Sequence, residues 1–152
     1  NIRTALMCLD LAINAKAFDR IILATDTPTG TGVMPLGMIK TICEMSCLSS
    51  YPPEMIISAA TGNNAVIYKL NNGFIERGRD ADIVIIDAAL GSSNKDPLAS
   101  IKNGDYPAIT AVFSQGIPRF IGRSRNTPPS TKKMKVYRNT ILNQFDPGRH
   151  TV

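Results

Sequence analysis

One aspartate at the end of a short apolar run is the residue of this sequence best placed to do chemistry. Asp26 lies in the stretch RIILATDTPTG, in which residues 21–23 are apolar and Pro28 and Gly30 turn the backbone away. An apolar run bounded by turn residues predicts a buried strand, here Ile21–Thr25. Helical patterns on both sides favour a strand that runs parallel to others, so Asp26 is expected at a strand's carboxyl end.

Parallel α/β folds build their active sites just beyond the carboxyl ends of their strands. A carboxylate in that position can bind a metal ion or carry a proton, whereas a structural Asp would only cap the following turn. Thr27 is a candidate for touching substrate or orienting Asp26, and the alternative is a bond from its side chain to the turn backbone. Arg20 precedes the strand and is expected near the amino-terminal end of the strand, away from Asp26.

The elements that must position Asp26 are helices. A stripe of apolar residues predicts a helix over Ile2–Phe18, which leads into the strand through a very short connection. After the glycine-rich and proline-rich loop that follows Asp26, helical spacing resumes at about Pro35. A short helix to about Ala60 and a further turn or two over Ala65–Leu70 complete this part.

After Asn71 the spacing of apolar residues changes from a helical pattern to one typical of extended strands. The pattern predicts four short β segments and a polar, turn-rich stretch over Gly91–Pro107. We therefore expect three regions: residues 1–70 with helices and one parallel strand, residues 71–123 with antiparallel β structure, and a basic tail over residues 124–152. Within the tail, only Val136–Phe145 has a helical pattern. The predicted β segments are Gly73–Glu76, Ala81–Asp87 and a hairpin of Ile109–Ser114 with Ile117–Ile121.

Composition places the chain among compact proteins, since 43% of its 152 residues are hydrophobic. No apolar stretch approaches the roughly 20 residues of a membrane-spanning helix, and no leader peptide is visible. Because the chain opens inside a helical pattern, we expect an upstream portion to be missing. Cys8, Cys43 and Cys47 cannot all pair with one another, and their apolar surroundings favour buried, reduced thiols in the cytoplasm.

The net charge of +5 is concentrated at the carboxyl end. Eight of the 17 Lys and Arg residues lie from Arg119 onward, where Asp146 is the only acid. A basic tail can contact nucleic acid or an anionic surface. Because it holds no recognised nucleic-acid motif, we interpret it as a solvated tail and expect neither nucleic acid nor a membrane as partner.

Four segments together resemble one protein family. ATDTP closing a strand, then ISAATGNNAVIYKL, GFIERGRDADIVIID and VFSQGIPRFIGR are similar, in this order and spacing, to the carboxyl-terminal part of the amidohydrolase superfamily. The likeness covers about residues 1–123. It is greatest to a cyclic-amide hydrolase of nicotinate fermentation. Imidazolonepropionase-like and dihydroorotase-like hydrolases and deaminases remain alternatives within the superfamily.

The resemblance implies an α/β fold in which this chain supplies the carboxyl-terminal piece of a (β/α)8 TIM barrel and part of a small composite β-sandwich. It also implies one or two divalent metal ions, zinc or iron, at the barrel mouth, with Asp26 as metal ligand and catalytic proton carrier. The implied reaction is hydrolysis of a cyclic amide C–N bond with release of ammonia. The intact protein is then expected to act on a small molecule and to be a homo-oligomer, with a tetramer as one form.

One departure from the family pattern limits what this chain can do alone. Members bind metal through a His-x-His pair, a bridging Lys or Glu and further histidines, whereas His150 is the single histidine here and lies outside the region of likeness. A single carboxylate is not a metal site, so the 152 residues alone are expected to be inactive. A truncated, non-catalytic protein that binds a partner through strand edges and its basic tail is the alternative from another functional class.

Overall fold

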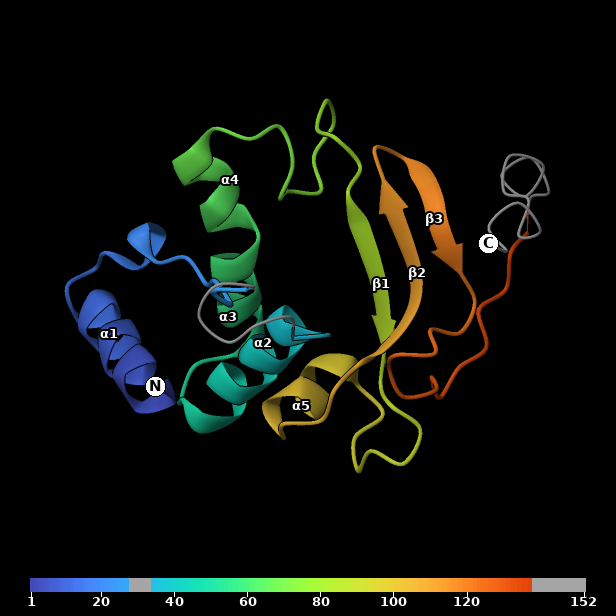
Figure 1. Cartoon of the computed structure of the whole chain (residues 1–152), viewed down its shortest axis with the longest axis horizontal. Helices are drawn as coiled ribbons and strands as arrows, with labels where there is room; N and C mark the ends of the chain where they lie inside the picture. The colour runs from blue at the N-terminus through green and yellow to red at the C-terminus, as the bar shows by residue number, and fades with distance from the viewer. Residues whose placement is uncertain (28–33, 138–152) are drawn as a thin grey trace.

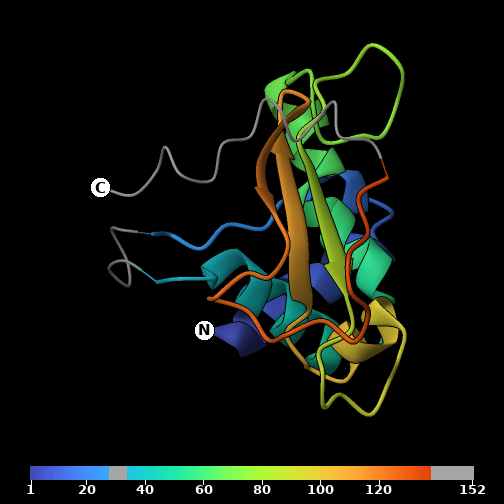
Figure 2. The same ribbon diagram turned by 90° about the vertical axis from the view of Figure 1, so that its right-hand side faces the viewer.

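The helices and the sheet lie side by side in the computed structural model, which describes residues 1–27 and 34–137 (Figure 1). After a quarter turn, the strands lie in front of the helices (Figure 2). Within the described residues, the sheet has three antiparallel strands in the order β1-β2-β3. In chain order the elements are α1 (Ile2–Asn14), a 3-10 turn η1 (Phe18–Arg20), α2 (Gly37–Leu48), α3 (Pro53–Ala60), α4 (Gly62–Tyr68), β1 (Ile83–Asp87), α5 (Pro97–Lys102), β2 (Ala108–Ser114) and β3 (Ile117–Ile121).

The helices begin and end close to the predicted positions, for identifiable local reasons. The side chain of Asn1 caps α1 by accepting a hydrogen bond from the backbone N–H of Arg3 at 3.1 Å. α1 ends at Asn14 rather than Phe18, because Lys16 adopts a left-handed conformation with φ of 55°. α3 has a proline in its first turn, as the sequence predicts.

The core of the helical part is a cluster of three fully buried side chains, Leu9 from α1, Met45 from α2 and Ile56 from α3. The predicted apolar stripe of α1 is confirmed, because its members pack on this cluster together with residues of the segment that leads to Asp26. The partly buried side chains around the cluster are Ile2, Leu6, Ile13, Phe18, Ile21, Leu23, Ile42 and Tyr51.

The three cysteines are free, but only one of them is buried. Burial, reinforced by the nearby Asp105 carboxylate, raises the pKa of Cys43 to about 11, so this thiol stays protonated near neutral pH. Cys8 and Cys47 are exposed, and the prediction of buried thiols is wrong for both. Cys8 precedes the buried Leu9, and one helical step of about 100° moves it off the core-facing stripe.

The predicted hairpin is confirmed, with Ser114 of β2 paired to Ile117 of β3. Both linking residues have positive φ, 52° at Gln115 and 74° at Gly116, which suits a two-residue hairpin turn whose twist matches that of the strands. The Asp82 carboxylate accepts a 2.9 Å hydrogen bond from the backbone N–H of Gln115 and so ties the start of β1 to this turn.

Two predictions after Asn71 are wrong. Residues 73–76 are not a strand, because Gly73 has φ of +80° and lies so close to α4 that a Cβ there would be 2.7 Å from the Cβ of Ala65. The stretch Gly91–Pro107 contains the helix α5, which was not predicted. Its signals were an Asp-Pro pair: the Asp96 side chain caps the helix by accepting from the N–H of Ala99 at 2.8 Å, and a proline occupies its first turn.

Residues 124–137 return along the end of β1. Thr131 Oγ1 and the backbone N–H of Lys132 each donate to the Asp87 carboxylate at 2.8 Å, and Ala89 forms an isolated antiparallel bridge with Ser130. As predicted, the described residues 124–137 contain no helix and no strand. The predicted helix Val136–Phe145 falls almost entirely outside the described residues.

Replacing Asp87 with Asn is expected to destabilise the fold near neutral pH and to matter less in acid. Burial acts to raise the pKa of Asp87, but the hydrogen bonds from Lys132 and Thr131 outweigh it and hold the pKa below its ordinary value of 3.8. A lowered pKa stabilises the fold above the ordinary value, and that stability is lost as pH falls through the folded-state pKa. Thermal melts of the wild type and D87N should therefore differ by a constant amount from about pH 7 to about pH 5 and converge as pH falls from about 5 to about 2. A difference that stays constant down to about pH 2 would contradict the prediction.

Candidate active site

The segment that carries Asp26 is extended but is not a paired strand within the described residues. Ile21 has extended dihedrals, φ −89° and ψ 130°, and no strand is formed over residues 21–25. The predicted strand Ile21–Thr25 is therefore wrong for this chain. A parallel strand needs neighbours for its backbone hydrogen bonds, and the one sheet among the described residues is antiparallel and formed by other segments.

The segment is held against the helices by alternate residues, as a strand would be. Ile21 and Leu23 pack on the core cluster, whereas Ala24 is exposed. The backbone N–H of Leu23 donates to the carbonyl of Ala59 in α3 at 3.0 Å. Thr25 lies against the start of α2, because a Cβ added to Gly37 would be 3.4 Å from its Cγ2.

Asn63 is a residue of this region that the sequence reasoning missed. Its side-chain amide nitrogen donates to the carbonyls of Phe18 at 2.9 Å and Ile21 at 2.7 Å, so α4 is tied to the turn that precedes the extended segment. The available signal was a polar TGNN sequence between two apolar helical runs. The sequence alone could not show which backbone carbonyls this amide would reach.

Asp26 lies at the end of this anchored segment, with an exposed side chain and a left-handed backbone, φ 54°. Asp is among the few residue types that tolerate this conformation. No hydrogen bond or ion pair joins the Asp26 carboxylate to another residue within the ranges 1–27 and 34–137. The alternative role as a cap of the following turn concerns residues 28–33, which lie outside the described ranges. Thr27 is exposed beside Asp26, and its contact with substrate stays a prediction.

The described residues do not by themselves fit a divalent metal ion. Within them, no group of three or more His, Cys, Asp or Glu side chains gathers at one point. A protein site for zinc or iron takes at least three side-chain ligands, whereas Asp26 offers one carboxylate. His150 lies outside the described residues. Any metal site that includes Asp26 would therefore need ligands from elsewhere.

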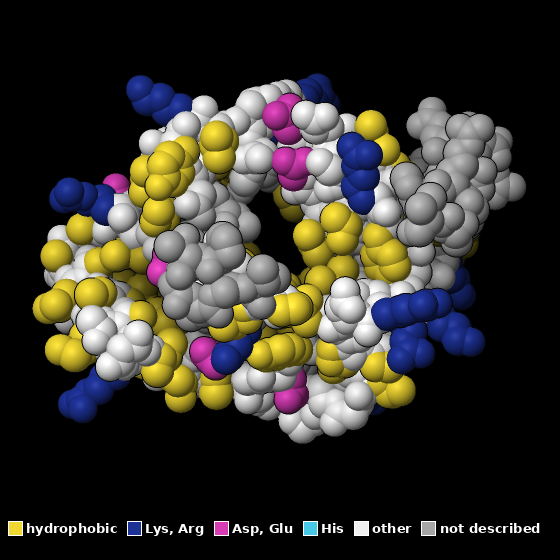
Figure 3. All heavy atoms as spheres, in the orientation of Figure 1, with side chains coloured by type: hydrophobic (Ala, Val, Ile, Leu, Met, Phe, Trp, Pro, Cys, Tyr) yellow, Lys and Arg dark blue, Asp and Glu magenta, His cyan; other side chains and the backbone are white. Residues whose placement is uncertain are grey.

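An apolar groove lies between the helices and β1 (Figure 3). It has a volume of about 490 Å³, and side chains from α2, α3, β1 and the loop before β1 line it, among them Met38, Ile42, Ile57, Phe74, Val84 and Ile86. Among the described residues, neither Asp26 nor Thr27 lines this groove. We therefore do not assign it to the chemistry of Asp26.

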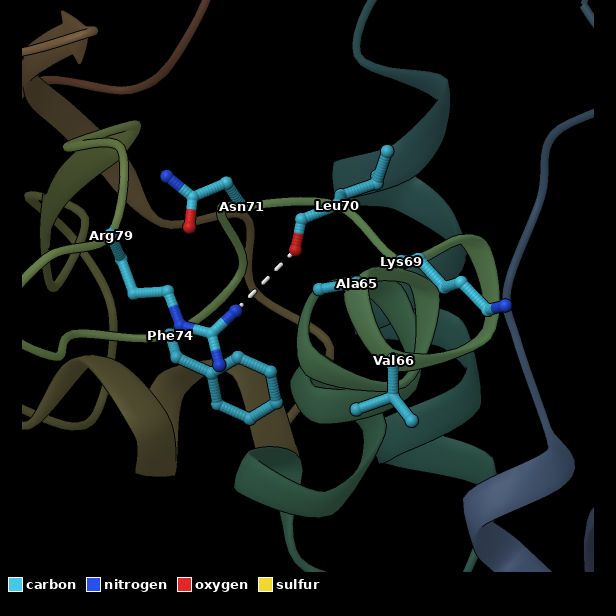
Figure 4. Close-up of a pocket in the computed structure, with 7 residues that line it drawn as sticks. All are labelled: Ala65, Val66, Lys69, Leu70, Asn71, Phe74 and Arg79. Atoms are coloured by element: carbon cyan, nitrogen blue, oxygen red, sulfur yellow. Dashed lines mark hydrogen bonds between the residues drawn. The ribbon is translucent and has the colours of Figure 1, made fainter.

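A second pocket, of about 330 Å³, lies between α4 and the loop that follows it (Figure 4). The Arg79 guanidinium lies over the ring of Phe74, 5.3 Å from its centroid, and donates to Glu76 at 3.0 Å and to the carbonyl of Leu70 at 3.4 Å. Lys69 points away from Arg79. Because these contacts tie Arg79 to its own loop, we interpret them as the structure of the loop rather than as a ligand site.

The comparisons with known proteins agree with the resemblance seen in the sequence. Residues 2–118 match the model of the amidohydrolase family. The chain belongs to this family. The enamidase of Eubacterium barkeri is 39% identical over 117 residues, which are 77% of this chain and 30% of the relative. The crystal structure of enamidase, described as a member of the amidohydrolase superfamily, superposes with a TM-score of 0.85 and 36% identity over 90% of this chain and 35% of that one.

This amidohydrolase chain thus spans about a third of the length of the relatives that it matches. The predicted fold class is confirmed, since the superposition relates the chain to the TIM-barrel fold of the superfamily. The predicted limits of the three regions stay a prediction. No helix among the described residues of the amidohydrolase has the length and apolarity to cross a membrane.

Proposed function

We propose that this chain is the carboxyl-terminal part of an amidohydrolase that cleaves the C–N bond of a cyclic amide. Enamidase is the best single assignment, with 6-oxo-1,4,5,6-tetrahydronicotinate as substrate. One water opens the ring amide to a carboxylate and an enamine, and a second water hydrolyses the enamine C–N bond to an aldehyde and ammonia. The observation that carries the proposal is the likeness to enamidase over 77% of the chain, at 39% identity. Asp26, anchored at the end of an extended segment and open to solvent, supplies a carboxylate suited to the chemistry.

In the proposed reaction Asp26 carries a proton. Hydrolysis of an amide needs a base to take a proton from the attacking water and an acid to protonate the leaving nitrogen. One carboxylate can do both in turn, and general acid-base help of this kind contributes on the order of 10²- to 10⁴-fold. Members of the superfamily generally use divalent metal ions. Zinc or iron is our proposal here, with ligands from outside the described residues in addition to Asp26.

A substrate panel on the full-length polypeptide that contains this chain tests the proposal. We expect ammonia release from a partly reduced pyridine lactam and none from dihydroorotate or imidazolonepropionate. Turnover of one of the latter would replace enamidase by a dihydroorotase-like or imidazolonepropionase-like hydrolase. Absence of all hydrolysis, in a preparation whose zinc and iron content equals that of an active amidohydrolase, would contradict the proposal.

Location and assembly are further parts of the proposal. The three free thiols favour the cytoplasm, because reduced cysteines persist there. We expect the full-length polypeptide to be a homo-oligomer that acts on a small molecule, with neither nucleic acid nor a membrane as partner. Light scattering coupled to size-exclusion chromatography measures the assembly directly, and a mass equal to one polypeptide would contradict the expected oligomer.

A further inference from the structure

Asn63 binds both ends of the turn η1, which precedes the segment that carries Asp26. Its amide nitrogen donates to the carbonyls of Phe18 and Ile21, residues that lie 45 and 42 positions away in the sequence. The Phe18 carbonyl also accepts the backbone N–H of Ile21 at 3.0 Å. A carboxamide nitrogen carries two hydrogens, so both donors of Asn63 are used on this turn.

The hydrogen bonds of Asn63 hold the same extended segment that ends at Asp26. The segment is hydrogen-bonded at Ile21 to Asn63 and at Leu23 to Ala59, and Thr25 lies beside Gly37 at the start of α2. These three contacts fall on alternate residues and end one residue before the carboxylate. The hydrogen bond of Asn63 is the anchor that a side-chain substitution can remove without changing the segment itself.

We infer that Asn63 is a positioning residue, which sets the place of Asp26 by holding the backbone of Phe18 and Ile21. This inference rests on the proposed function, because it gives Asp26 a catalytic task. Displacement of a catalytic group by about 1 Å can cost on the order of 10²-fold in rate. The amide is suited to the task since it binds two carbonyl oxygens with one atom, which neither a carboxylate nor an aliphatic side chain can do.

Two variants test whether Asn63 positions Asp26. N63D keeps the size and shape of the side chain but removes the donors, and it places an oxygen against two carbonyl oxygens. An acidic residue near the start of α4 is compatible with the helix itself. N126D is the matched control, because it makes the same Asn-to-Asp change at an exposed residue that lies outside the segment, α3 and α4.

The test combines kinetics with hydrogen exchange. In the full-length polypeptide, N63D should lower kcat by about 10- to 100-fold with KM changed less than about twofold, whereas N126D should leave both near wild type. In the 152-residue chain, N63D should speed exchange of the Leu23 amide by about 10-fold relative to N126D, because the segment loses its bond at Ile21, two residues earlier.

Two outcomes would overturn the inference, and they are distinguishable. If D26N abolishes activity while N63D leaves kcat unchanged, Asn63 does not position the carboxylate and the proposed function is unaffected. If D26N itself leaves kcat unchanged, Asp26 has no catalytic task, and the assignment of the reaction to this residue fails together with the positioning role.

Discussion

Replacing Asp26 with Asn in the full-length polypeptide is expected to lower kcat by on the order of 10²- to 10⁴-fold, the usual contribution of a general acid-base group. The amide of Asn keeps the size of the side chain but cannot accept and return a proton at neutral pH. Because Asp26 is exposed and packs on nothing in the described core, the melting temperature should stay near that of the wild type. Steady-state kinetics and thermal melts of the same preparation measure both quantities.

Asp19 provides the matched control for this variant. It is another exposed acid, seven residues earlier, and D19N removes the same charge without reaching the end of the segment. We expect D19N to keep kcat within about twofold of wild type, as for a surface substitution away from any site. Equal losses in the two variants would show that net charge, rather than the position of Asp26, governs the rate. Zinc and iron content should be measured in both, because Asp26 is also the proposed metal ligand.

The helices and the hairpin were predictable because their signals are local. The stripe of α1 and the turn at Gln115 and Gly116 follow from spacing and turn chemistry within a few residues. The strand Ile21–Thr25 was predicted from equally local signals but depends on distant partners. Its apolar run is present, and Ile21 and Leu23 pack on the core, yet a single extended segment has no parallel neighbour among the described residues to complete a sheet.

The candidate site was predictable only in part, for a similar reason. The position of Asp26 after an apolar run identified the carboxylate, and the structure places it at the end of an anchored segment. Asn63 could not be found in this way, because its role depends on backbone carbonyls more than 40 residues away. At Gly73 the sequence predicts a strand that does not form, because the close approach of Gly73 to Ala65 requires a left-handed backbone.

Lys102 is a second long-range contact that local patterns could not reveal. It ends α5, and its ammonium group donates to three backbone carbonyls, one in the last turn of α2 and two just after it: Ser46 at 2.9 Å, Ser49 at 2.7 Å and Tyr51 at 2.8 Å. An ammonium group has three hydrogens, so its full donor capacity is used. The last carbonyls of a helix lack partners within it, and a positive charge there is favourable. Lys102 thus joins α5 to the layer that holds the Asp26 segment.

Replacing Lys102 with Met is therefore expected to destabilise the 152-residue chain by about 2–3 kcal/mol, because Met keeps the apolar stem but leaves three carbonyls without their charged donor. For a chain of this length the melting temperature should fall by about 5–10 °C. The control is K95M, since Lys95 is exposed just before the same helix and should tolerate the change within about 0.5 kcal/mol. K102R should restore only part of the loss, because a planar guanidinium cannot converge on three carbonyls as an ammonium does. If K102M has the same melting temperature as K95M, water replaces the ammonium group without loss of stability, and the prediction is contradicted.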